Sequence, residues 1–179
     1  MKLDSTAILK NIVHNLSIPS GRHLYAVLGN YQALEEFIQN TIRQSRLPDG
    51  SPFPDPVSVN KLFLSGFNED DLGETINKES KRPKYTQSKL NRIFEDFLRE
   101  QFNQTNFIIL QHLELVFAYS LDLSKLRRWA ANQNHILILL PGEIRNQQIY
   151  LFHNRHTGEL LKFDNQLFSE NNIWELDDE

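Results

Sequence analysis

The sequence has no cysteine among its 179 residues. This absence excludes a disulfide framework, a thiol nucleophile and a zinc or iron–sulfur site with thiolate ligands. A chain without cysteine fits a reducing compartment, and we expect a cytoplasmic location. Lysine and arginine (19) are fewer than aspartate and glutamate (23), so no overall positive charge points to nucleic acid. No uncharged apolar run approaches the ~20 residues of a membrane-spanning helix, so we expect no membrane partner.

The length is typical of one domain, which we expect to span residues 1–179. Four of the seven prolines lie in segment 47–56, and this predicts a stiff surface loop. The acidic segment 170–179 is expected to form a loose tail, although Ile173 and Trp174 could dock on the rest of the chain.

Apolar residues recur at helical spacing in four segments. The expected helices span 5–16, 31–46, 87–102 and 124–131. Ser5 and Thr86 are the expected N-cap residues of the first and third helices, because their hydroxyls can accept hydrogen bonds from the first turn.

Short apolar runs between these helices predict buried strands. The expected strands span 23–29, 57–65, 105–116 and 135–140, with Pro141-Gly142 closing the last, and a hairpin formed by 147–152 and 160–163 comes after them. Segment 135–140 is apolar on both alternating faces, as in a central parallel strand. The alternation of helices and strands predicts a three-layer α/β fold with a mostly parallel central sheet and a C-terminal β-hairpin.

Ligands of open parallel sheets bind at the carboxyl ends of the strands. The first such end is Gly29-Asn30, which leads directly into the helix over 31–46. A P-loop has the pattern G-x-x-x-x-G-K-[ST], whose backbone N–H groups and Lys surround the phosphates. This junction has one Gly and neither Lys nor Ser/Thr at the required place, so it is interpreted as a simple turn.

The strand that ends at Leu110 is followed by Gln111, where a magnesium-binding strand would carry Asp. An amide carries no charge and is a poor magnesium ligand. Glu114 remains nearby, but a surface or capping role is favoured for it. No cofactor and no metal are therefore expected.

His112 and Glu114 form the best-placed titratable pair in the sequence, with Glu143 following the next strand. A structural polar pair is favoured over a catalytic one, and we find no nucleophile motif of the G-x-S-x-G type. An enzyme with a site around these three residues stays open as an alternative.

Basic residues gather in two places and could contact phosphate or an acidic partner. The residues singled out are Lys81, Arg82, Lys84, Arg127 and Arg128. They leave a second alternative open, a nucleic-acid-binding accessory subunit, although the acidic composition does not favour it.

Segment 82–152, about 40% of the chain, resembles small P-loop-type proteins of BREX bacteriophage-resistance systems. The BrxF type is closest in layout, and the BrxB type is a second possibility. The resemblance is carried by an apolar strand with a Glu-Leu turn, a short helix with Leu and Arg, a long apolar strand and a Gly-acidic turn. The matching positions are Ile108–Phe117, Leu123–Trp129, Ile136–Leu140 and Pro141-Gly142-Glu143.

The resemblance implies a degenerate P-loop NTPase-like core, because the BrxF type is P-loop-containing and this chain lacks both parts of the site. The degenerate positions are Gly29, Asn30, Gln111 and Glu114. The resemblance further implies a non-catalytic adaptor in an antiphage defence complex. Its partners would be the large ATPase, the methyltransferase or the phosphatase-like subunit of such a system.

Overall fold

A computed structural model describes the chain except for residues 1, 68–82, 147, 152–160, 164 and 178–179. The strands are β1 (Lys2–Leu3), β2 (Leu24–Gly29), β3 (Val57–Ser58), β4 (Phe107–Gln111), β5 (His135–Arg145), β6 (Gln148–Leu151), β7 (Leu161–Phe163) and β8 (Ile173–Leu176). The α-helices are α1 (Ser5–Leu16), α2 (Tyr31–Glu36), α3 (Val59–Ser65), α5 (Pro83–Phe102), α6 (Glu114–Ala118) and α7 (Ser124–Trp129). A π-helix, η1 (Phe37–Ile42), continues α2, and the 3₁₀ turns η2 (Asn165–Leu167) and η3 (Glu170–Asn172) precede β8.

The central sheet has the strand order β1-β8-β2-β5-β4-β3, and all of these neighbours pair in parallel. β2 lies between β5 and β8, with Ala26 opposite Ile138 on one side and Ile173 on the other. Every residue of β2 is buried, which explains its uninterrupted apolar sequence. The prediction of an α/β fold with a mostly parallel central sheet is confirmed.

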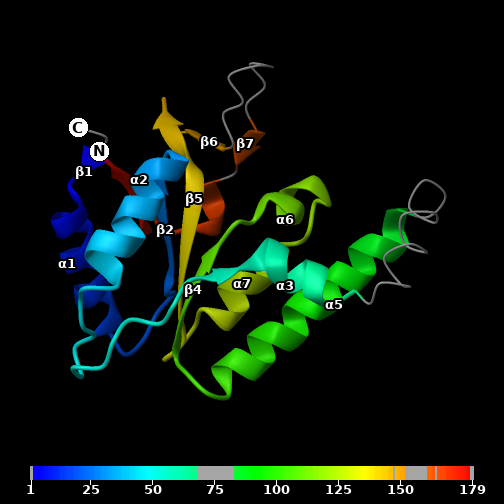
Figure 1. The fold of residues 1–179 in the computed structure, drawn as a ribbon, viewed down its shortest axis with the longest axis horizontal. Coiled ribbons are helices and arrows are strands. Elements are labelled where there is room, and N and C mark those ends of the chain that lie inside the picture. The colour runs from blue at the N-terminus through cyan, green and yellow to red at the C-terminus, as the bar shows by residue number, and fades with distance from the viewer. Residues whose placement is uncertain (1, 68–82, 147, 152–160, 164, 178–179) are drawn as a thin grey trace.

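Helices pack on both faces of this sheet (Figure 1). On one face, α1, α2 and η1 bury side chains such as Ile8, Ile12 and Phe37 against the strands. On the other face, α3, α5, α6 and α7 form a larger core that includes Phe63 and Leu90. The expected helices over 5–16, 31–46, 87–102 and 124–131 each have an observed counterpart, although the second changes to π-helical hydrogen bonding at Phe37.

The expected strand over 57–65 is wrong beyond its first two residues. Only Val57 and Ser58 pair with β4, and Val59–Ser65 forms helix α3. Ser58 caps this helix, and Val59 and Phe63 are buried four residues apart on one side of it. The β-branched residues of this segment suggested a strand, but the spacing of its buried residues is helical.

Two further strand boundaries differ from the expectation. The strand expected over 105–116 ends at Gln111, because the chain turns at His112 with a φ of 53° and continues as α6. Pro141-Gly142 does not close the last expected strand, and β5 instead continues to Arg145. Pro141 ends the pairing with β2 at Gly29, and Gly142 begins an antiparallel pairing with β6 at Leu151.

The N-cap residues predicted for the first and third expected helices are both wrong. Asp4 caps α1, because its Oδ1 accepts a hydrogen bond from the Ala7 N–H at 2.8 Å, and Ser5 is the first helical residue. Thr86 lies inside α5 and is buried, because this helix begins at Pro83.

The acidic segment 170–179 is not a loose tail over 170–176. It forms η3 and then β8, whose residues Trp174, Glu175 and Leu176 are buried between β1 and β2. The last two residues lie outside the described part of the chain. β6 pairs antiparallel with β7, and the connection over 152–160 is likewise outside the description. Among the described residues, none of the helices combines the length and apolar character needed to cross a membrane.

Candidate functional site

The carboxyl ends of the parallel strands meet at one edge of the sheet, and the candidate site lies there. β2 ends at Gly29, β4 at Gln111 and β8 at Leu176, while Pro141 marks the point where β5 leaves the parallel sheet. The structure therefore brings together the positions Gly29, Asn30 and Gln111 that are far apart in sequence.

The Gly29-Asn30 junction is a direct strand-to-helix turn, as expected. Asn30 caps α2, with its Oδ1 accepting from the Ala33 N–H at 2.8 Å and its carbonyl accepting from the Leu34 N–H at 3.0 Å. A Cβ atom at Gly29 would lie 3.2 Å from Leu176 Cδ1, so Gly29 allows close packing against β8. The side chain of Asn30 therefore occupies the Ala33 N–H, a backbone donor that an anion at this turn would need.

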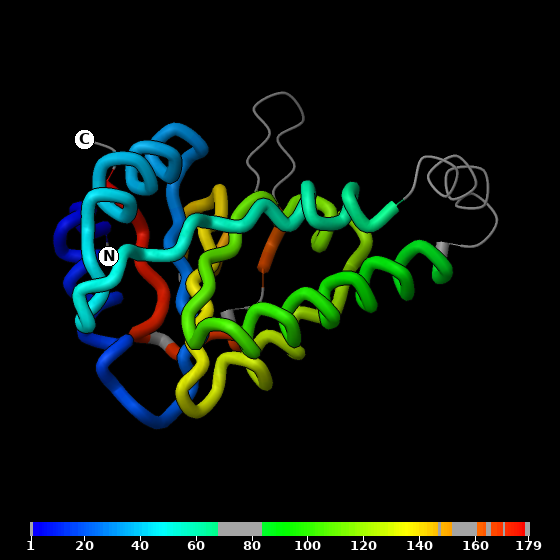
Figure 2. The backbone as a smooth tube through the Cα atoms, turned by 60° about the horizontal axis from the view of Figure 1, so that its bottom comes forward, coloured from blue at the N-terminus to red at the C-terminus, as the bar shows by residue number. Residues whose placement is uncertain are grey.

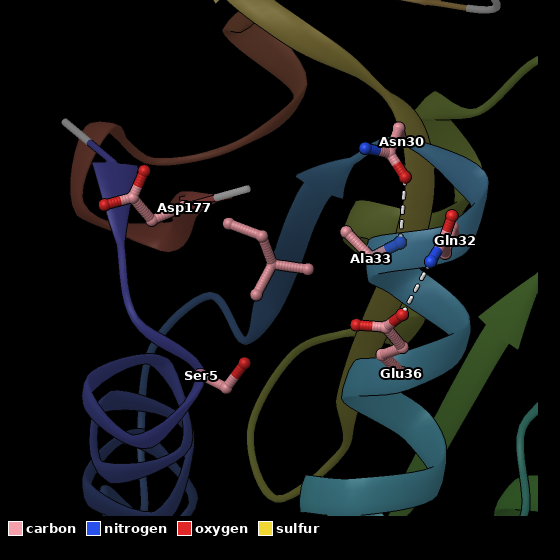
Figure 3. Close-up of a pocket in the computed structure, with 7 residues that line it drawn as sticks. Ser5, Asn30, Gln32, Ala33, Glu36 and Asp177 are labelled. Atoms are coloured by element: carbon pink, nitrogen blue, oxygen red, sulfur yellow. Dashed lines mark hydrogen bonds between the residues drawn. The ribbon is translucent and has the colours of Figure 1, made fainter. Parts of the chain in front are cut away.

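A pocket of about 290 Å³ opens beside this turn, between the start of α1, the end of β8 and α2 (Figure 3). Ser5 and Asp177 line one side, and Asn30, Gln32 and Glu36 line the other. Gln32 Nε2 donates to Glu36 Oε1 at 2.9 Å. Among the described residues that line the pocket, none is Lys or Arg and two are carboxylates. This charge distribution opposes the binding of phosphate.

A second cleft of about 300 Å³ shares Asn30 and Leu176 with the first pocket. Its lining includes two cations, Lys2 and Arg145, and both have an acidic neighbour: Arg145 forms an ion pair with Glu143, and Lys2 interacts electrostatically with Glu175. Burial raises the pKa of the Glu175 carboxyl above its usual range, and the charge of Lys2 opposes this shift. The cations at this edge are thus already compensated by the chain's own carboxylates.

Glu114 joins three elements at the carboxyl edge. Its Oε1 accepts from the Tyr31 hydroxyl at 2.9 Å, and its Oε2 accepts from Asn60 Nδ2 at 2.6 Å. Asn60 Oδ1 accepts in turn from the Leu115 N–H at 3.1 Å. Burial and the hydrogen bond to Glu114 raise the pKa of Tyr31 to about 12, so its hydroxyl stays protonated at neutral pH.

His112 and Glu114 lie on the same turn but have different partners. His112 Nδ1 lies 3.2 Å from Ser58 Oγ, whereas Glu114 binds Tyr31 and Asn60. Gln111 Nε2 points to the Pro56 carbonyl at 3.5 Å, which is a weak contact. Glu143, the third residue of the alternative enzyme site, forms its ion pair with Arg145 on β5. This arrangement links Ser58 and Asn60 to the start of α6, and His112 and Glu114 contact these other residues in place of the polar pair expected between them.

The structure describes only some of the basic residues that we expect to contact phosphate or an acidic partner. Lys81 and Arg82 lie outside the described residues, and Lys84 is exposed in the first turn of α5. Arg127 and Arg128 lie on α7, where Arg128 interacts with Glu95 of α5 and the neighbouring Lys125 forms an ion pair with that carboxylate at 2.5 Å. Within the part of the chain that the structure describes, no group of three or more His, Cys, Asp or Glu residues could hold a metal ion.

Sequence reasoning missed Tyr31, Ser58, Asn60 and Glu175 at this edge. The sequence predicts a strand for the segment of Ser58 and Asn60 and a loose tail for that of Glu175, so it does not indicate that they lie near Gln111 and Gly29. Tyr31 alone carried a signal, because it directly follows the Gly29-Asn30 turn. Comparisons of the chain with protein-family models, curated proteins and solved structures find no significant match.

Proposed function

We propose that this chain is a non-catalytic adaptor subunit of a BREX-like antiphage defence complex. It would act through protein–protein contacts on a P-loop-like scaffold that lacks a working nucleotide site. The observation that carries the proposal is the pocket beside Asn30, whose described lining includes the carboxylates Glu36 and Asp177 and neither Lys nor Arg. The family itself is suggested by the sequence pattern of segment 82–152.

The arrangement of strands supports a P-loop-like origin. β2, which would precede the phosphate loop, and β4, which would carry the magnesium-binding Asp, flank the same strand, β5. Their ends at Gly29 and Gln111 therefore face the same edge of the sheet, as a shared nucleotide site would require. The antiparallel pairing of β6 with β7 supports the C-terminal hairpin of the proposed fold.

The charges at the carboxyl edge of the sheet also lack what a nucleotide site requires. Mg-nucleotide binding needs cationic groups around the phosphates and a carboxylate on the metal. Here Gln111 is neutral, and Arg145 is paired with Glu143. Glu114 is held by Tyr31 and Asn60, so it contributes to the structure of the edge and is not free to orient a water molecule.

An adaptor role would take its partner from the same defence system. The candidates are the large ATPase, the methyltransferase and the phosphatase-like subunit, and the complex would be cytoplasmic. Protein partners are favoured over nucleic acid because the chain carries a net charge of -4.

Titration of the purified chain with Mg-ATP in a calorimeter tests the non-catalytic part of this proposal. We expect no saturable heat and no release of phosphate, with a P-loop ATPase of known affinity as the positive control. A matched variant carrying Glu36→Gln and Asp177→Asn reports whether the two carboxylates repel the nucleotide. Micromolar binding with turnover that Gln111→Ala abolishes would show that the chain is a working ATPase.

A further inference from the structure

The segment that links η1 to β3 lies on the outside of the fold and contains a tight turn over residues 47–51 (Figure 1 and Figure 2). The Gly50 N–H donates to the Leu47 carbonyl at 2.9 Å, and the Leu47 N–H donates to the Ser51 carbonyl at 2.8 Å. Asp49 and Gly50 are exposed in this turn. Among the described residues, no atom would lie within 4 Å of a Cβ atom at Gly50, so the space beside it is open.

Ser51 holds the carboxylate of Asp49 in this turn. Asp49 Oδ1 accepts hydrogen bonds from the Ser51 N–H at 2.9 Å and from the Ser51 hydroxyl at 2.6 Å. This contact between an Asp side chain and the backbone two residues on is typical of turns. The two hydrogen bonds, that of the hydroxyl first, lower the pKa of the Asp49 carboxyl below its usual range. The carboxyl group is therefore kept ionised, although water surrounds it.

Asp49-Gly50 is the one place in the sequence where Asp or Asn precedes Gly. The backbone nitrogen of the residue after an Asp can attack the side-chain carboxyl, because the ring that closes has five members. Glycine favours this attack, since it has no Cβ atom to crowd the nitrogen or to restrict the backbone. Asp55, in the same loop and also exposed, precedes Pro56, whose nitrogen carries no hydrogen and cannot react in this way.

Asp122 provides an internal comparison with Asp49. It is exposed and accepts hydrogen bonds from the Ser124 N–H, at 2.9 Å, and from the Ser124 hydroxyl. These are the contacts that Asp49 makes two residues on, but Leu123 stands where Gly50 follows Asp49. The chain therefore presents the same carboxylate contacts once with glycine and once with a bulky residue.

We propose that Asp49 is a site of spontaneous isomerisation to isoaspartate, and that Ser51 sets the rate of this reaction. The Gly50 nitrogen forms a bond to Asp49 Cγ, and its hydrogen leaves with the carboxyl hydroxyl as water, which closes a succinimide ring. Water then adds to the main-chain carbonyl of the ring and breaks the bond from that carbonyl to the Gly50 nitrogen. The chain now continues through the side-chain carboxyl, and an α-carboxylate is released. One water leaves and one enters, so no oxidant, reductant or cofactor is consumed.

The hydrogen bonds of the turn slow this reaction. The hydroxyl leaves only from a protonated carboxyl, and Ser51 favours the ionised form. The Gly50 N–H must also leave the Leu47 carbonyl before its nitrogen can attack. Isomerisation adds a carbon to the backbone and moves the carboxylate, so both Ser51 bonds are lost in the product. Phe53 is buried, with its ring 6.0 Å from that of Phe107, and this anchor limits the change to the turn.

Incubation of the purified chain at neutral pH, below its melting temperature, tests the proposal. Trypsin releases residues 47–61 as one peptide that carries both Asp49 and Asp55. Isoaspartate has the same mass as aspartate, so it is identified by its resistance to the protease Asp-N and by its fragment ions in electron-transfer dissociation. We expect isoaspartate to accumulate at Asp49 and not at Asp55 or Asp122. A synthetic peptide of residues 47–61 should react faster, because it lacks the hydrogen bonds of the folded turn.

Matched serine variants give the second readout. Ser51→Ala should raise the rate at Asp49 about threefold, because the carboxylate loses one of its two hydrogen bonds. Ser124→Ala removes the corresponding hydroxyl at Asp122 and should produce no isoaspartate there, because leucine follows that residue. Asp49→Glu, which can close only a six-membered ring, should remove the signal. Thermal melting of each variant checks that it folds.

Three outcomes would overturn the inference. Absence of isoaspartate at Asp49 in the folded chain would show that the turn prevents the reaction. Equal rates in the wild type and in Ser51→Ala would show that Ser51 does not set the rate. Isoaspartate at Asp122 in a similar amount would show that glycine is not the determinant. The inference goes beyond the adaptor function and does not depend on it, so none of these outcomes bears on that function.

Discussion

The Tyr31 hydroxyl donates a hydrogen bond to Glu114 Oε1 at 2.9 Å, and this bond joins α2 to α6 across the carboxyl edge of the sheet. The two residues follow the ends of β2 and β4, which lie on either side of β5. Their hydrogen bond therefore ties two helices together across the end of the central strand.

Asn60 completes this connection, and its removal should destabilise the fold. Asn60→Ala removes the hydrogen bonds to Glu114 Oε2 and to the Leu115 N–H. We expect a loss of about 2 kcal/mol in the free energy of unfolding, because two partly buried groups lose their partner. Urea denaturation measures this loss, and Lys61→Ala, an exposed change at the next position, is the matched control. Equal stability of the two variants would contradict the structural role assigned to Asn60.

Glu175 should weaken the fold at neutral pH. Burial raises its folded-state pKa above the unfolded value, so its contribution to stability is present at low pH and is lost as the pH rises through the folded pKa. Glu175→Gln should therefore raise the free energy of unfolding at pH 7 and have little effect near pH 4. The same stabilisation at both pH values would show that the carboxylate charge is not the cause.

A buried cluster of His23, Tyr25 and His135 should make the fold sensitive to acid. The Tyr25 hydroxyl lies 3.1 Å from His23 Nδ1 and 3.2 Å from His135 Nδ1, and the two imidazoles stack at 4.1 Å. Burial first, and then the neighbouring His23, lowers the pKa of His135 to about 4. The unfolded chain thus binds a proton below pH 6.5 that the folded chain excludes, and stability should fall as the pH drops from 6.5 to 4.

The predicted loss is on the order of 3 kcal/mol for His135 alone. Urea denaturation of the wild type and of His135→Asn between pH 7 and pH 4 measures it, and the difference between the two curves removes the contribution of carboxylates that titrate in the same range. If both proteins lose stability in parallel, His135 does not titrate as the geometry requires.

Strand β5 can continue through Pro141-Gly142 because Gly142 has no side chain. A Cβ atom at Gly142 would lie 2.5 Å from the Tyr150 carbonyl oxygen and 2.8 Å from Leu151 Cδ2. Gly142→Ala should therefore cost about 2 kcal/mol or more, because backbone of the paired strand would have to move. Gly29→Ala, whose nearest contact is 3.2 Å from a side-chain atom, should cost less in the same thermal or urea measurement.

The sequence was sufficient for β2, for the first half of β5 and for long amphipathic helices such as α5. β2 and the first half of β5 are apolar on both faces, a pattern that parallel pairing explains without further information. α5 was found because its buried residues Leu90, Phe94 and Leu98 recur every four positions.

Elements fixed by distant contacts could not be predicted. Segment 170–176 has an acidic composition, and its alternating Trp174 and Leu176 become a strand only because β1 and β2 flank them. Pro141-Gly142 is a typical turn pair, yet the change of partner from β2 to β6 allows a strand to pass through it. The contacts of the candidate site were missed for the same reason, since Ser58 and Asn60 reach Gln111 and Glu114 only through the pairing of β3 with β4.

Purification of the chain from its own operon tests the adaptor function most directly. The tagged chain is expressed with its neighbouring genes and analysed by size-exclusion chromatography with light scattering and mass spectrometry. We predict one stable complex that contains the chain and the large ATPase, the methyltransferase or the phosphatase-like subunit, with the ATPase activity of the complex unchanged by Gln111→Ala. Elution of the chain alone, without any of these proteins, would contradict the adaptor function.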